Sequence, residues 1–179
     1  MTTFDEARRL LRRRGGRAHL LVRHRGETVL DERLGVGPEA AFWPFSVSKL
    51  WIATLVWALH DDGALDVDDP VADHWPEFGR HGKRATILDV LRHRSGVPRA
   101  GSTLAEVAAM TDWRRATAAI APAPPIRRHD AKPAYEWLAW GFILGEVARR
   151  ATGLSAEALP GLLRDRILDP LGADGTSLG

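Results

Sequence analysis

The chain has 179 residues, 45% of them apolar, which is enough for one domain with a sizeable core but not for two full domains. Its 25 basic and 23 acidic residues nearly cancel, so the charge gives no reason to expect nucleic-acid binding. The chain contains no cysteine, which excludes disulfides, thiolate catalysis and cysteine-ligated zinc.

The N-terminal residues have no apolar core of the kind that a secretory signal needs. Residues 1–14 carry five arginines, and no later stretch approaches the roughly eighteen uncharged apolar residues of a membrane span. We therefore expect a cytoplasmic protein without a membrane partner.

The same N-terminal residues predict a helix. Thr3 and Glu6 have the spacing of a capping box, and an apolar stripe follows at Phe4, Ala7, Leu10 and Leu11. The arginines of this helix would then face solvent, and an arm for anionic membranes or nucleic acid is the alternative. Two short β-prone runs, 19–22 and 28–30, flank Arg25-Gly26 and predict a hairpin that ends near residues 35–37.

The remainder of the chain predicts helices and no convincing strand. Val47 to Asp61 is densely apolar and is closed by Gly63, and residues 86–92 begin with a Thr-x-x-Asp cap. Residues 121–125 carry three prolines and predict an extended connector. Further helices are expected at 103–110, 112–120, 138–152 and 155–168.

The segment Phe45-Ser-Val-Ser-Lys-Leu-Trp51 combines a serine and a lysine three positions apart. On a helix Ser46 and Lys49 share one face, so the amine can reach the hydroxyl. A lysine can activate a serine if burial lowers its pKa towards 7, a shift of roughly 4 kcal/mol. Apolar neighbours are available for this at Phe42, Trp43, Phe45, Leu50 and Trp51. The alternative is a solvent-directed lysine beside a capping serine.

Several landmarks in order resemble the serine β-lactamase-like family, which includes class C β-lactamases, D-alanyl-D-alanine carboxypeptidases and related esterases. They are residues 45–51, the Asp-Gly-Ala-Leu-Asp-Val-Asp-Asp-Pro-Val run at 62–71, His74-Trp-Pro-Glu-Phe78, Leu91-Arg-His-Arg-Ser-Gly-Val-Pro98, Tyr135 to Gly153, and Asp169-Pro-Leu-Gly172. The resemblance runs from about residue 17 to the end of the chain. It implies an α+β, DD-peptidase-like fold.

The resemblance also implies roles for three residues. Ser46 matches the acylated nucleophile, Lys49 its hydrogen-bonded activator, and Tyr135 the residue that transfers a proton to the leaving group. A phenol with a pKa near 10 becomes a useful base only if cations stabilise its anion, and Lys49 can do so. A purely structural Tyr135, packed under the proline-rich connector, is the alternative.

Two departures from the family pattern bear on activity. Trp137 stands where many relatives have Asn, which makes an amide-bearing β-lactam or D-Ala peptide a less favoured substrate than a carboxylic ester. Nothing in the sequence matches the third family motif, which usually supplies the second oxyanion donor, and losing one such donor costs about 10² to 10³ in rate. We expect at most slow labelling of Ser46 and no sustained hydrolysis of β-lactams.

These departures define the expected domain. Residues 1–179 are expected to form one β-lactamase-like domain that is C-terminally incomplete, with a helix and hairpin at 1–36 and a helical region at 37–179. The remaining sheet strands are expected to be absent. A two-stranded hairpin is only marginally stable by itself, so a partner chain that completes the sheet is a possibility.

Other candidate sites are weaker. His93 and Ser95 suggest a catalytic pair, although in the family this stretch is similar to a helix end with a structural role. The acidic run 61–69 lacks the glycine and closing glutamate of a calcium loop, and the histidines lack zinc spacing. We expect neither a metal nor a cofactor.

Three hypotheses follow. The first is a serine hydrolase that acts on esters through an acyl-enzyme at Ser46. The second is an inactive fragment that retains the nucleophile segment. The third is a non-enzymatic binding module that uses the hydrophobic face exposed by the missing strands.

Overall fold

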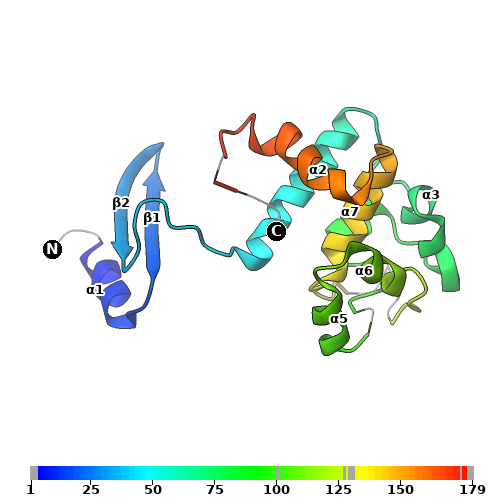
Figure 1. Cartoon of the computed structure of the whole chain (residues 1–179), viewed down its shortest axis with the longest axis horizontal. Helices are drawn as coiled ribbons and strands as arrows, with labels where there is room; N and C mark the ends of the chain where they lie inside the picture. The colour runs from blue at the N-terminus through cyan, green and yellow to red at the C-terminus, as the bar shows by residue number, and fades with distance from the viewer. Residues whose placement is uncertain (1–3, 100, 127, 129–131, 174, 177–179) are drawn as a thin grey trace. The chain divides into compact units, whose positions relative to one another are not determined.

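The computed structural model describes residues 4–99, 101–126, 128, 132–173 and 175–176. The chain divides into two compact units, Met1–Trp43 and Pro44–Gly179. Figure 1 shows a helix with a hairpin in the first unit and a group of helices in the second. The helical region therefore begins a few residues later than the boundary at residue 37 that the sequence suggested.

The first unit consists of helix α1 (Asp5–Arg14) and an antiparallel hairpin of β1 (Ala18–His24) and β2 (Glu27–Leu34). The two turn residues, Arg25 and Gly26, both have positive φ, at 51° and 86°. Two-residue hairpin turns require this conformation because it matches the twist of the strands. The predicted hairpin is confirmed.

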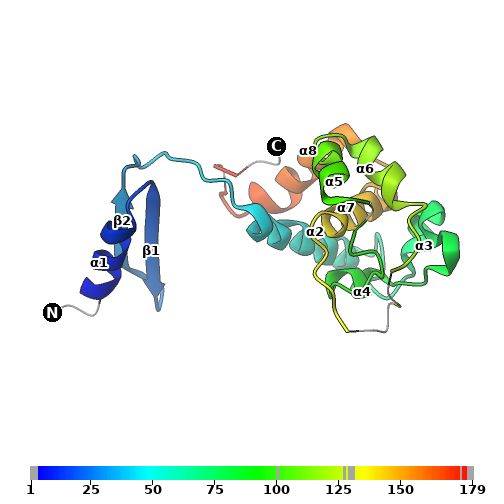
Figure 2. The ribbon, with the colours of Figure 1, turned by 90° about the horizontal axis from the view of Figure 1, so that it is seen from below.

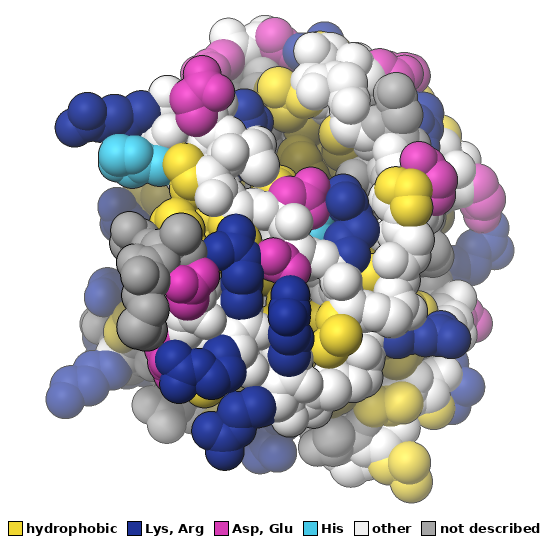
Figure 3. Space-filling view, turned by 90° about the vertical axis from the view of Figure 1, so that its left-hand side faces the viewer, with side chains coloured by type: hydrophobic (Ala, Val, Ile, Leu, Met, Phe, Trp, Pro, Cys, Tyr) yellow, Lys and Arg dark blue, Asp and Glu magenta, His cyan; other side chains and the backbone are white. Residues whose placement is uncertain are grey.

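Helix α1 contacts β2 through charged side chains. Nε of Arg8 donates to Oε1 of Glu32 over 2.7 Å, and Arg9 pairs with Glu6 one turn away. Basic and acidic side chains are interspersed on the face seen in Figure 3. Since acidic groups lie among the arginines, this charge distribution favours an ordinary solvated helix over an arm for polyanions. Thr3, expected to cap α1, lies outside the described residues.

The second unit is built around helix α7 (Ala139–Ala151). Eight of its residues are buried, from Ala139 to Ala148, and α2, α3, α4 and α6 contact it. Figure 2 shows α6 and α4 on opposite sides of α7. A helix that is apolar on most sides must be covered by neighbours on most sides, so α7 organises this unit. The bounds of the other helices are α2 Lys49–Asp61, α3 Val71–His74, α4 Ile87–Leu91, α5 Thr103–Ala109, α6 Trp113–Ile120 and α8 Leu159–Leu163.

Short helical segments supplement these helices. Three 3₁₀ segments and one π-helical turn occur at Phe45–Ser48, Pro76–Gly82, Ala156–Ala158 and Arg164–Leu168. The expected single helix at 155–168 is therefore wrong, because the chain changes helical type twice within it. Helix α3 and the segment after it were not predicted. They are short and are held by burial of Val71, Trp75 and Phe78.

Two helix ends lie where local patterns in the sequence predict them. Oγ1 of Thr86 accepts from the Asp89 amide, and Oδ2 of Asp89 accepts from the Thr86 amide, both over 3.1 Å. This is the predicted capping box at the start of α4. Gly63 has φ 73° just after α2, the left-handed conformation that ends helices.

A buried lysine holds the proline-rich connector. Nζ of Lys83 donates to the carbonyl oxygens of Ala121 and Ala123 over 2.8 and 2.6 Å, and the side chain is buried. Burial lowers the pKa of Lys83 to about 8. The connector cannot make regular ladder bonds because of its prolines, and Lys83 satisfies two of its carbonyls instead.

Two glycines of α7 allow a controlled test of its packing. A Cβ at Gly145 would lie 2.5 Å from Cη2 of Trp113 and 3.2 Å from a methyl group of Leu159. A Cβ at Gly141 would meet nothing within 4 Å. We predict that Gly145→Ala lowers the free energy of unfolding by about 1–3 kcal/mol through overpacking. Gly141→Ala should leave it unchanged or raise it by about 0.5–1 kcal/mol through helix propensity. Urea unfolding measures both changes, and equal effects at the two positions would contradict this account of α7.

Candidate active site

The nucleophile candidate lies at the beginning of a helix. The 3₁₀ segment Phe45–Ser48 leads directly into α2, so the predicted helix start near Ser46 is confirmed. Phe45 has φ 46°, a left-handed conformation that is costly for a bulky residue. Ser46 is exposed, and Nζ of Lys49 approaches its Oγ at 3.5 Å. The serine and the lysine therefore lie on one face, as their spacing predicts.

Tyr135 reaches the same serine from a distant part of the sequence. Its hydroxyl donates to Oγ of Ser46 over 2.5 Å, although 89 positions separate the two residues. Two residues later, the backbone carbonyl of Trp137 accepts a hydrogen bond from Nζ of Lys49 over 2.9 Å. The structure thus brings together all three residues that the sequence singled out, and it adds a main-chain oxygen that the sequence could not indicate.

Two aromatic rings lie near Lys49, but they do not belong to the neighbouring residues expected from the sequence. Its Nζ lies 5.2 Å from the ring centroid of Tyr135 and 5.8 Å from that of Trp140. The predicted enclosure by the adjacent apolar residues is wrong, since Phe45 is 72% exposed and Leu50 is 66% exposed. An ammonium near aromatic faces is stabilised by the ring quadrupoles, so these contacts position a lysine that remains partly accessible.

The electrostatics of the site favour ionisation of Tyr135. The hydrogen bond with Ser46 lowers the pKa of Tyr135 most. Burial opposes this effect, and the hydrogen bond and positive charge of Lys49 lower the pKa further. A tyrosine with a lowered pKa exchanges a proton with a bound hydroxyl more readily at neutral pH. The pKa of His93 is also lowered, first by burial and then by the charge of Lys49.

His93 and Ser95 make structural contacts, in agreement with the interpretation of this stretch as a helix end. His93 follows α4 with φ 58°, and its ring centroid lies 4.7 Å from that of Tyr135. Oγ of the buried Ser95 accepts from the amide of Val97 over 3.0 Å. His93 is therefore adjacent to the tyrosine, although Ser95 is occupied with the backbone of its own turn.

Glu136 was not among the candidates predicted from the sequence, and it lies between Tyr135 and Trp137. Its side chain is fully buried, and Oε1 accepts from the Ser95 amide over 2.8 Å. Among the described residues Oε2 has no hydrogen-bond partner. Burial raises the pKa of Glu136 to about 7 against the lowering effect of Ser95. The only sequence signal was its position beside Tyr135.

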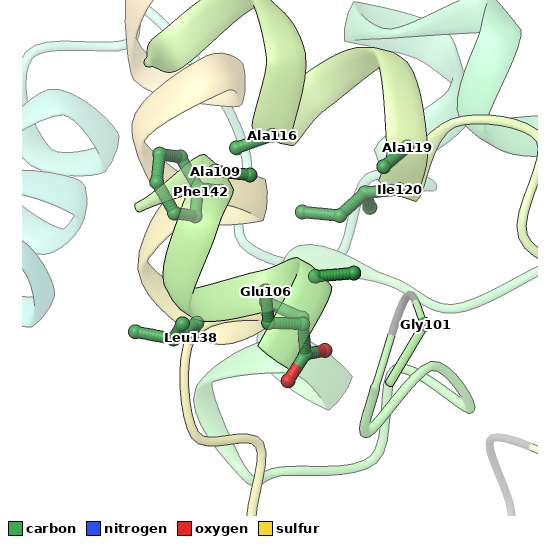
Figure 4. Close-up of a pocket in the computed structure, with 10 residues that line it drawn as sticks. Gly101, Glu106, Ala109, Ala116, Ala119, Ile120, Leu138 and Phe142 are labelled. Atoms are coloured by element: carbon green, nitrogen blue, oxygen red, sulfur yellow. The ribbon is translucent and has the colours of Figure 1, made fainter. Parts of the chain in front are cut away.

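A separate apolar hollow lies between α5, α6 and α7 (Figure 4). It encloses about 370 Å³, part of it open to solvent, and is lined by side chains such as Ala109, Ile120 and Phe142. None of Ser46, Lys49 and Tyr135 lines it. The hollow is therefore distinct from the Ser46 site.

The described residues contain neither a membrane-spanning helix nor a grouping of metal ligands. No helix among them combines the length and apolar character needed to cross a bilayer. In the same part of the chain, no three histidine or acidic side chains are grouped so that they could hold a metal ion. The acidic run instead forms local bonds, such as the one from the Asp66 amide to Oδ2 of Asp69.

With this geometry described, comparison with known proteins identifies the family of the chain. The Beta-lactamase family model matches residues 7–179, and the chain belongs to this family. It is 34% identical over 178 residues to the esterase/beta-lactamase LipL of Mycobacterium tuberculosis (strain ATCC 25618 / H37Rv), covering 93% of this chain and 40% of that protein. It is 32% identical to penicillin-binding protein 4 of Amycolatopsis lactamdurans, covering 84% of this chain and 38% of that protein.

Solved structures confirm the β-lactamase-like fold. A penicillin-binding protein homolog from Caulobacter crescentus is similar with a TM-score of 0.78 and 28% identity. A family VIII carboxylesterase is similar with a TM-score of 0.75 and 29% identity. Each comparison covers 94% of this chain and 48% of the other. The chain thus spans less than half the length of these relatives.

The raised pKa of Glu136 predicts a pH dependence of stability. Its carboxyl has a pKa of about 7 in the fold, against an ordinary value of 4.5. Between these values the folded state binds a proton that the unfolded state has released, so this group makes the free energy of unfolding fall as pH rises, by up to about 3 kcal/mol. Glu136→Gln cannot ionise, and its unfolding free energy should fall less over the same range. Urea titrations at several pH values measure the difference, and parallel pH profiles for the two proteins would contradict the prediction.

Proposed function

We propose that the chain carries the acylation site of a serine hydrolase that acts on carboxylic esters through an acyl-enzyme at Ser46. The observation that supports this most directly is the contact of the Tyr135 hydroxyl with Oγ of Ser46 at 2.5 Å, with Nζ of Lys49 at 3.5 Å from the same oxygen. A serine hydroxyl needs a neighbouring base before it is nucleophilic, and this arrangement supplies one together with a cation that stabilises the base.

The proposed acylation begins with removal of the serine proton. Tyr135, as the phenolate stabilised by Lys49, takes the proton from Ser46 while Oγ attacks the ester carbonyl carbon. The tetrahedral intermediate then expels the alcohol oxygen, which receives the proton from Tyr135. The ester bond of the substrate breaks and an ester bond to Ser46 forms, so the phenolate is regenerated. In deacylation water replaces the alcohol: Tyr135 takes a proton from the water that attacks the acyl carbon, Oγ of Ser46 leaves and receives that proton, and the carboxylic acid is released.

The start of the helix contributes a donor for the developing oxyanion. The amide of Ser46 lies in the first turn of the 3₁₀ segment Phe45–Ser48, where backbone amides have no intrahelical acceptor. Such an amide, with the helix dipole behind it, can stabilise negative charge on the carbonyl oxygen of the substrate. The loss of one oxyanion donor in related chemistry costs about 10² to 10³ in rate, so this amide would make a large contribution to acylation.

The preference for esters is supported by the residue two positions after Tyr135. Trp137 is 39% exposed, and its side chain has no amide carbonyl to bind the amide of a β-lactam or peptide substrate. Its backbone carbonyl is already bonded to Lys49. Relatives whose names include esterase or carboxylesterase are consistent with this preference.

A non-enzymatic binding role is the second candidate, and one observation favours it. Leu21 and Val29 are exposed, at 49% and 38%, on the face of the hairpin opposite Leu30. A partner chain that completes the sheet would pair with its unpaired strand edges and cover this exposed apolar face. Failure of Ser46 to react in the experiment below would favour this role.

The first prediction for the proposed function concerns labelling. A fluorophosphonate or an activated p-nitrophenyl ester should modify the 179-residue chain at one position, Ser46, and Ser46→Ala should abolish this. Lys49→Ala and Tyr135→Phe should slow it by about 10² to 10⁴ through loss of the base. Intact-mass spectrometry with peptide mapping measures the modification. Ser102→Ala, which changes a distant helix cap, is the control, and equal labelling of it and Ser46→Ala would refute the proposal.

The second prediction concerns substrate class. A short-chain p-nitrophenyl ester should acylate Ser46 faster than benzylpenicillin does, because no side-chain amide at Trp137 binds the lactam amide. Trp137→Asn should raise the rate with penicillin relative to the ester by about tenfold, the effect of roughly one charge-free hydrogen bond. Mass spectrometry measures the rate at which each compound forms a covalent adduct with Ser46. Faster acylation by penicillin in the unmodified chain would overturn the ester preference.

A further inference from the structure

Glu136 lies between the two residues that contact the Ser46 and Lys49 pair. Tyr135, before it, touches Oγ of Ser46, and the carbonyl of Trp137, after it, accepts from Nζ of Lys49. We propose that the buried Glu136 is a positioning residue that fixes both of these contacts by anchoring the segment to the turn at His93–Ser95. This inference rests on the proposed function, because the site it positions is the proposed acylation site.

The anchor consists of three hydrogen bonds between two segments about forty positions apart. The amide of Ala134 donates to the carbonyl of His93 over 3.0 Å, and the amide of Glu136 donates to Nδ1 of His93 over 3.2 Å. The amide of Ser95 donates in return to Oε1 of Glu136 over 2.8 Å. The backbone on both sides of Tyr135 is therefore held, although Tyr135 itself is exposed.

The side chain of Glu136 supplies one of these three hydrogen bonds, and a substitution can remove it. It is fully buried, so an alternative partner for the Ser95 amide could not be solvent. Without the carboxyl, the buried amide of Ser95 would lose its acceptor. The segment that carries Tyr135 and Trp137 would then lose this hydrogen bond to the turn at His93–Ser95. A neutral glutamine keeps the shape and the acceptor oxygen.

His93 supports the same tyrosine in two ways. Its Nδ1 accepts the Glu136 amide, so in this arrangement a neutral ring carries its proton on Nε2. Its ring packs against Tyr135 at 4.7 Å between centroids. Burial and the charge of Lys49 both lower the pKa of His93, which favours the neutral ring that this hydrogen bond needs.

The chain offers a readout of position that does not depend on activity. Tyr135 is its only tyrosine, so tyrosinate absorbance in the near ultraviolet reports the ionisation of Tyr135 alone. The hydrogen bond with Ser46 and the charge of Lys49 lower the pKa of Tyr135. A tyrosine displaced from them must therefore titrate closer to its ordinary value of 10. Tyr135→Phe confirms that the signal comes from this residue.

The test compares Glu136→Ala with Glu136→Gln in the full chain. In Glu136→Ala the Tyr135 midpoint should rise towards its ordinary value of 10, and Ser46 labelling should slow by about tenfold or more because Tyr135 is no longer held against Ser46. Glu136→Gln should restore both values towards those of the unmodified chain, because it still accepts from Ser95. Glu146→Gln is the matched control. Glu146 is also a buried carboxylate, and it pairs with Trp113, Arg149 and Arg150. Removal of its charge should lower the free energy of unfolding without moving the Tyr135 midpoint.

Each outcome has a distinct meaning. A folded Glu136→Ala chain with an unchanged Tyr135 midpoint would overturn the inference. If Glu136→Ala does not fold, Glu136→Leu decides instead: leucine fills much of the same volume but offers no acceptor to the Ser95 amide, so an unchanged midpoint there would equally overturn the inference. If the midpoint shifts as expected but the unmodified chain is never labelled, the proposed function fails while the positioning role of Glu136 stands.

Discussion

The packing of α2 against α7 is the contact on which the site depends. Helix α7 is buried on most of its surface, so α2 lies against it to complete the core. Ser46 and Lys49 stand at the beginning of α2, and Tyr135 and Trp137 immediately precede α7. The hydrophobic effect that joins the two helices therefore also brings together their N-terminal ends, which carry all the polar groups of the site.

Lys49 is the cation that links the groups of the site. Lys49 donates to Trp137 and Ser46, lies near the rings of Tyr135 and Trp140, and lowers the pKa of both Tyr135 and His93. The positive charge of Lys49 thereby favours ionisation of Tyr135 and the neutral form of His93. A neutral His93 can continue to accept the Glu136 amide, so the charge of Lys49 and the anchor of Tyr135 support each other.

Buried polar groups of the second unit act mainly on irregular backbone. Lys83 binds two carbonyls of the proline-rich connector, and Glu136 binds the Ser95 amide in the turn after α4. Neither segment can satisfy its backbone groups by regular secondary structure, and a buried unpaired amide or carbonyl is costly. These two buried charges are thus explained by the loops they hold rather than by ion pairing.

The sequence alone determined the hairpin turn at Arg25-Gly26, the capping box of Thr86, the extent of α2 and the pairing of Ser46 with Lys49, because each depends on residues a few positions apart. Resemblance to the family predicted Tyr135 as their partner. Only the tertiary structure decided that Phe45 and Leu50 stay exposed, that 155–168 breaks into three segments, and that Glu136 and His93 support the tyrosine. These features depend on burial and on contacts between distant segments, and neither periodicity nor local spacing in a single sequence contains that information.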